Sequence, residues 1–127
     1  MIQAKDLRIG NLISAALYPN AITVESICSS NEDIYNRDTG EIPLHSIFPI
    51  TLSSDWLLKF GFKFSNGFYE MKINFLYIAI MLDNTTLMIE DVHEDAINIK
   101  SPEFVHQLQN VFYCLTGEEL QVVANGS

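Results

Sequence analysis

Turn-forming residues interrupt the first ninety residues at short intervals, so no element in that part of the chain can be long. Pro19-Asn20, Asp38-Thr39-Gly40, Asn66-Gly67 and Asp83-Asn84-Thr85 carry these signals. The runs between them are rich in Val, Ile, Thr, Tyr and Phe, which is typical of β-strands. We therefore expect an α+β protein built mainly from short antiparallel strands.

The first fifty residues predict a small β unit. Its candidate strands are residues 11–17, 22–28, 34–36, 41–43 and 48–50, with one helical turn at 44–47. Four or five short strands with a helical turn before the last one are the layout of an SH3-like barrel. This is an analogy of fold, and it implies no particular activity.

Residues 51–127 predict a second, α-β-β-β-α unit. Ser53 can cap a short helix that Gly61 ends, with Trp56 in its core-facing part. An antiparallel β-meander follows through residues 64–90, with a hairpin at Asn66-Gly67. We expect residues 124–127 to fray. The two units, 1–50 and 51–127, are expected to pack as one compact globule.

The last helix is predicted from its capping residues and its apolar spacing. Ser101 suits the N-cap, Pro102 the first helical position and Gly117 the C-terminal stop. Six apolar side chains fall on one stripe of this helix: Phe104, Val105, Leu108, Val111, Phe112 and Leu115. We expect this amphipathic helix to pack on the apolar face of the meander.

The polar face of the same helix is the candidate protein interface. His106, Asn110 and Tyr113 recur at helical spacing, Gln109 flanks them, and residues 104–115 contain no charged side chain. An uncharged face is easy to desolvate and can form hydrogen bonds, which favours contact with protein. Two other interpretations remain: a simple polar exterior, or cover by another part of the same chain.

The charge balance argues against several partners. The chain has 16 acids and 7 bases, and the net charge of -9 disfavours binding to nucleic acid or to an anionic membrane surface. Eight of the acids but only one base, Lys100, lie from Asp83 onward. The charge indicates solubility or, alternatively, a partner with a basic face.

The sequence contains no recognisable catalytic, metal or cofactor motif. The acidic loop Glu90–Asp95 lacks the glycine and the alternate oxygen ligands of a calcium site. The two cysteines, Cys28 and Cys114, have no zinc or disulfide spacing, and no nucleophile elbow or phosphate-binding glycine loop occurs. We expect no catalytic residue, no metal and no cofactor. With no signal peptide or membrane span in the sequence, we expect a cytoplasmic protein.

Three runs carry a resemblance to a known family. They are Lys-Asp-Leu-Arg-Ile-Gly-Asn at 5–11, Ser-Ser-Asp-Trp-Leu-Leu-Lys-Phe-Gly-Phe at 53–62, and the helix segment 105–120. Together they resemble a family of small uncharacterised proteins of Bacteroides-type bacteria and their phages or mobile elements. The resemblance implies a bacterial or phage setting and supplies no catalytic residues.

The leading hypothesis is a non-enzymatic module that binds a protein partner or self-associates into a homo-oligomer. One alternative is an acidic decoy that inhibits a nucleic-acid-binding protein, because carboxylates can imitate phosphates. Another is a small hydrolase whose site the sequence does not reveal.

Overall fold

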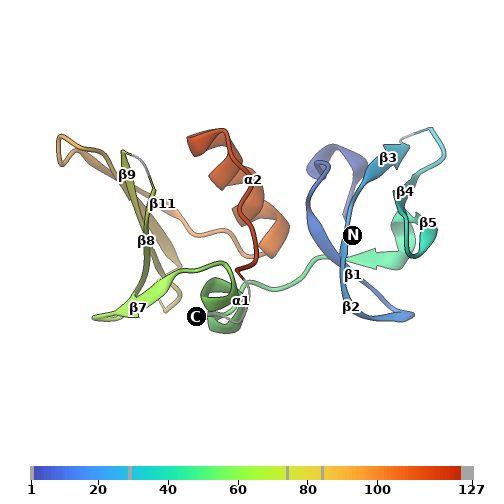
Figure 1. Cartoon of the computed structure of the whole chain (residues 1–127), viewed down its shortest axis with the longest axis horizontal. Coiled ribbons are helices and arrows are strands. Elements are labelled where there is room, and N and C mark those ends of the chain that lie inside the picture. The colour runs from blue at the N-terminus through green and yellow to red at the C-terminus, as the bar shows by residue number, and fades with distance from the viewer. Residues whose placement is uncertain (1, 29, 74, 84, 124–127) are drawn as a thin grey trace. The chain divides into compact units, whose positions relative to one another are not determined.

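The computed structural model describes residues 2–28, 30–73, 75–83 and 85–123 (Figure 1). Residues 124–127, for which we expected fraying, lie outside that description. The chain divides into two compact units: residues 1–51 with 104–119, and residues 52–103 with 120–127. It is an α+β protein in which short antiparallel strands predominate, as the sequence predicts.

The first unit contains two three-stranded antiparallel sheets. One has the order β2-β1-β6, and the other has the order β3-β4-β5. The strands and 3-10 turns of this unit are η1 (Ala4–Asp6), β1 (Leu12–Ala15), β2 (Tyr18–Thr23), β3 (Ser26–Cys28), β4 (Asp33–Asn36), β5 (Gly40–Pro43), η2 (Leu44–Ser46) and β6 (Ile47–Phe48). As described, these strands form open sheets and not a closed barrel.

One apolar cluster joins the N-terminal strands of the first unit. Ile13, Val24 and Ile34 are fully buried within it, and Leu44 from η2 also belongs to it. The predicted helical turn before the last strand is confirmed as η2. Pro43 ends β5, the kind of terminal place that a residue without an N–H can take in a sheet.

The turn predicted at Pro19-Asn20 is wrong. The chain turns earlier, at Ala16-Leu17. Pro19 and Asn20 lie within β2, which pairs with β1 through Ile13↔Ile22 and Ala15↔Tyr18. Because β2 is an edge strand, a proline costs the sheet no hydrogen bond on its outer side. Only Ile22 of this strand is buried, so packing rather than local propensity determines its register.

The second unit is one short helix and a five-stranded antiparallel sheet of order β11-β10-β9-β8-β7. Its elements are α1 (Ser54–Lys59), β7 (Lys63–Ser65), β8 (Phe68–Ile73), β9 (Leu76–Met81), β10 (Thr86–Glu90) and β11 (Ala96–Lys100). Ser53 caps α1 through the N–H of Trp56, and Asn66-Gly67 forms the β7–β8 hairpin with positive φ at both residues, as predicted.

The apolar core of the second unit combines the first helix with one face of the sheet. Leu57 and Phe60 of the α1 region are buried, as are Ile78 and Ile80 of β9 and Leu87 of β10. The sequence predicts an antiparallel meander over residues 64–90, and β11 is a further strand beyond it. Residues 97–99 have the alternation typical of a short extended segment, and pairing with β10 lengthens that segment to a full strand.

The last helix, α2 (Val105–Thr116), begins later than predicted. Ser101 and Pro102 are not its cap and first residue, because the chain is held extended there: Phe104 bridges Thr51, and the N–H of Val105 donates to the carbonyl of Ile50. Gly117 ends the helix with a left-handed φ of 74°, as predicted.

Helix α2 also groups differently from the predicted division at residue 50. It belongs to the compact unit of the N-terminal strands, and not to the unit of residues 52–103. Val105, Leu108 and Phe112 of its apolar stripe are buried. The expectation that this stripe packs on the meander stays a prediction. Residues 120–123 have a strand-like sequence, yet they form no strand.

Candidate functional site

The polar face of α2 is bonded to the N-terminal segment of its own unit. The side chain of Gln109, which is 2% exposed, spans two backbone groups. Its Nε2 donates to the carbonyl of Gly10 at 3.1 Å, and its Oε1 accepts from the N–H of Leu12 at 2.8 Å. These two bonds join α2 to the segment that enters β1.

Asn110 is the second amide of this contact. Its Oδ1 accepts from Asn11 Nδ2 at 2.8 Å and from Arg8 Nε at 3.2 Å, while its Nδ2 donates to the carbonyl of Asp6 at 3.3 Å. Asn11 is completely buried, and its own Oδ1 accepts from the N–H of Arg8. A buried polar group must be paired in this way to avoid a large desolvation cost.

Arg8 joins the network to the end of the helix. Its guanidinium forms an ion pair with Glu119 and lies over the Tyr113 ring, 4.4 Å from the ring centroid to Cζ. A second N–H donates to the carbonyl of Gln109. Two of the three runs that carry the family resemblance, 5–11 and 105–120, therefore contact each other here.

The four residues predicted as a protein interface thus have different surroundings. Gln109 and His106 are buried within the first unit, Asn110 is half-buried, and Tyr113 is 42% exposed with Arg8 against its ring. The side chains of Gln109 and Asn110 bond to residues 6–12 of the same chain, which agrees with the second alternative, cover by another part of the chain. Their role in binding a separate protein stays a prediction.

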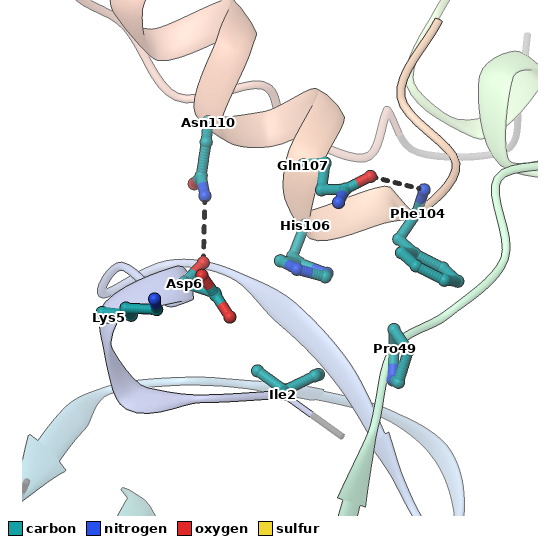
Figure 2. Close-up of a pocket in the computed structure, with 8 residues that line it drawn as sticks. All are labelled: Ile2, Lys5, Asp6, Pro49, Phe104, His106, Gln107 and Asn110. Atoms are coloured by element: carbon teal, nitrogen blue, oxygen red, sulfur yellow. Dashed lines mark hydrogen bonds between the residues drawn. The ribbon is translucent and has the colours of Figure 1, made fainter.

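A cavity of about 510 Å³ lies beside this network (Figure 2). Its wall combines apolar side chains with amide and charged groups. The lining residues are Ile2, Lys5, Asp6, Pro49, Phe104, His106, Gln107 and Asn110. Figure 2 shows the His106 ring pointing from the start of α2 toward Ile2 and Asp6, with Phe104 on its other side.

His106 is the most unusual group of this cavity. Its side chain is 3% exposed, and its Nδ1 is buried without a hydrogen-bond partner among the described residues. Burial lowers the pKa of His106 below its ordinary 6.5, and the negative charge of Asp6 opposes this in part. Burial therefore favours the neutral form of this imidazole. No Ser, Thr or Cys is among the lining residues, so the cavity offers His106 no hydroxyl or thiol nucleophile.

The acidic loop Glu90–Asp95 is organised by one of its own residues. Asp91 Oδ1 accepts from the N–H of His93 at 2.9 Å and of Asp95 at 3.1 Å. Within the described part of the chain, no group of three or more His, Cys, Asp or Glu residues is arranged to hold a metal ion. The loop is therefore a turn that connects β10 to β11.

Strand β11 forms one edge of the five-stranded sheet of the second unit, and all five residues of β11 are exposed. Ile97 and Ile99 are 60% and 41% exposed. They lie opposite Ile89 and Leu87, which are buried, so the four side chains share one face of the sheet. An apolar face thus continues to the edge of the sheet without cover there.

Only half of the backbone hydrogen-bonding groups of β11 face β10. At one end of the β10–β11 pair the N–H of Ser101 donates to the carbonyl of Thr85, and at the other end the N–H of Asp91 donates to the carbonyl of Asp95. Because hydrogen-bonded and non-hydrogen-bonded pairs alternate along an antiparallel ladder, every second residue of β11 directs its N–H and C=O groups toward β10. By this alternation Ile97 and Ile99 bond to β10. Ala96, Asn98 and Lys100 direct their N–H and C=O groups away from the sheet, and among the described residues β11 pairs with no other strand.

Sequence reasoning missed this edge because three alternating residues are too short a signal for a strand. Pairing with β10 gives the segment its length, and the sheet order gives it its exposure. The pattern Ile97-Asn98-Ile99 was nevertheless visible as a period of two.

Comparison with known proteins gives no match to a family model, to a curated protein or to a solved structure. Of the helices that the structure describes, none has the length and apolar character to cross a membrane. The resemblance drawn from the three sequence runs stays a prediction.

Proposed function

We propose that this protein is a non-enzymatic protein-binding module that accepts an extended segment of its partner as an additional strand beside β11. The observation that carries the proposal is the unpaired, exposed edge of Ala96–Lys100. Strand addition is a common mode of recognition, in which main-chain hydrogen bonds provide affinity and alternate side chains provide specificity.

The chemistry of the edge supports this mode of binding. Ala96, Asn98 and Lys100 offer outward backbone donors and acceptors, and Ile97 and Ile99 offer apolar contact on one face. Exposed edge strands of natural proteins are commonly blocked by charge, proline or a bulge. Here Lys100 at the end of the strand is the only such residue within it.

Three features of its strands support an SH3-like scaffold for the first unit, whose two sheets are open. Their strands surround one apolar cluster, β2 and β3 are separated by only Val24 and Glu25, and η2 precedes β6. We propose this unit as an SH3-like scaffold. Free thiols at Cys28 and Cys114 suit the reducing cytoplasm that we propose as its setting.

The alternative functions have weaker support. For an acidic decoy, the carboxylates from Asp83 onward would need to form one extended surface at phosphate-like spacing. Glu118 and Glu119 instead belong to the first unit, and Glu119 pairs with Arg8. For a hydrolase, the cavity beside His106 offers no hydroxyl or thiol nucleophile.

The experiment is affinity purification from the native host with two matched variants. Asn98→Pro removes an outward N–H at a position where proline is compatible with an edge strand, and Asn98→Ser keeps that N–H. We expect the wild type and Asn98→Ser to retain the same partner protein, whether another protein or a second copy of this chain, and Asn98→Pro to lose it. The amides of residues 96, 98 and 100 should exchange more slowly in the complex. Equal retention by all three proteins would overturn the proposal.

A further inference from the structure

We infer that the strand added to β11 is the β11 of a second copy of this chain, paired antiparallel about Asn98. This inference rests on the proposed function and names its partner. A strand edge can bind many extended segments, and three properties of Ala96–Lys100 select a second copy: the hydrogen-bonding positions, the apolar pairs and the charges.

The hydrogen-bonding positions are symmetric about Asn98. The outward residues are Ala96, Asn98 and Lys100, so a two-fold axis through Asn98 places it opposite its own counterpart and Ala96 opposite Lys100. Each of these pairs is then of the hydrogen-bonded kind, in which both residues exchange N–H and C=O bonds. No outward group of the strand is left unpaired.

The apolar side chains are symmetric about the same axis. Ile97 of one copy comes opposite Ile99 of the other, in the non-hydrogen-bonded pairs where side chains approach most closely. Both lie on the face that contains the buried Leu87 and Ile89. Pairing therefore covers the two isoleucines that are exposed in the single chain.

The charges favour the antiparallel orientation. Lys100 stands at one end of β11, and the acids Glu94 and Asp95 precede its other end. Antiparallel pairing brings each Lys100 beside the acids of the other copy, whereas a parallel pair would align like charges. Within its own chain, Lys100 forms an ion pair with Glu103 at 3.4 Å. Both side chains are exposed, so this pair is weak and competes little with pairing to the acids of a second copy.

Disulfide trapping tests the register. In a background that carries Cys28→Ser and Cys114→Ser, Asn98→Cys should form a disulfide-linked dimer under mild oxidation, because paired residues lie about 5.5 Å apart between Cα atoms. Ala96→Cys alone should not, since its counterpart lies about four residues, or roughly 13 Å, along the strand. A mixture of Ala96→Cys and Lys100→Cys proteins should cross-link to each other.

Sedimentation equilibrium tests the association itself. The wild type and Asn98→Ser should show the same concentration-dependent dimer, and Asn98→Pro should raise the dissociation constant at least about tenfold, the equivalent of about 1.4 kcal/mol. A wild type that is monomeric at every concentration would overturn the inference, as would equal cross-linking of Ala96→Cys and Asn98→Cys. If the wild type is monomeric but binds another protein in a manner sensitive to Asn98→Pro, the second copy is wrong and the proposed function stands.

Discussion

Asn11 donates from its side-chain amide to the side-chain oxygen of Asn110 at 2.8 Å, and this bond joins residues 99 positions apart in the sequence. The contact lies inside the first unit, together with the bonds that Gln109 makes to Gly10 and Leu12. The uncharged face of α2 therefore has a structural role within its own chain. At the buried position of Gln109, a charged side chain would be costly.

Replacing Gln109 should destabilise the first unit. Gln109→Met keeps the size of the side chain but leaves the carbonyl of Gly10 and the N–H of Leu12 without their partner. We expect a loss of about 1–3 kcal/mol in the free energy of unfolding, measured by urea denaturation followed by circular dichroism. Gln121→Met, at an exposed position, is the control and should change little. Equal stability of the two variants would contradict the role of Gln109.

A side chain at position 10 should destabilise the first unit. Its φ is 101°, and an added Cβ would lie 3.1 Å from a carboxylate oxygen of Glu119. We expect Gly10→Ala to reduce the free energy of unfolding by about 1 kcal/mol or more. Gly40→Ala separates the two causes, because Gly40 also has a positive φ but open space around it. The Gly10 variant should be the less stable of the two, and the opposite order would show that the contact with Glu119 does not matter.

Stability should fall in mildly acidic solution because of His106. Its folded pKa lies below the ordinary value of 6.5, so the unfolded chain takes up a proton first as the pH falls. The contribution is therefore complete above pH 6.5 and is lost as the pH falls toward the folded pKa. The measurement is urea denaturation at a series of pH values for the wild type and His106→Gln. A shallower pH dependence in the variant is expected below pH 6.5, and identical slopes would contradict the assignment.

Tyr77 should titrate late in alkaline solution. Its hydroxyl donates to the Glu70 carboxylate, which with burial raises the pKa of Tyr77 to about 12. A spectrophotometric titration of the wild type against Tyr77→Phe should show that the missing tyrosine ionises at about pH 12. In Glu70→Gln the pKa of Tyr77 should move back toward its ordinary value of 10.0, because the negative charge is gone. An unshifted Tyr77 signal in the wild type would contradict this contact.

Local elements were predictable where a few adjacent residues decide them. The cap at Ser53, the hairpin at Asn66-Gly67 and the stop at Gly117 follow from side-chain reach and from positive φ. The start of α2 was not predictable, because a backbone bond from Val105 to Ile50 overrides the signals at Ser101 and Pro102. The turn at Pro19-Asn20 failed for a similar reason, since the register with β1 extends β2 through both residues.

The sequence by itself determined the α+β class, most of the strands, both helices and the absence of charge on one face of α2. These depend on short-range periodicity and on turn chemistry, which neighbouring residues encode. Only the tertiary structure decided that Gln109 and Asn110 bond to residues 6–12 and that β11 is an exposed edge. Both outcomes depend on which distant segments meet, and that is set by the burial of the whole core rather than by any local pattern.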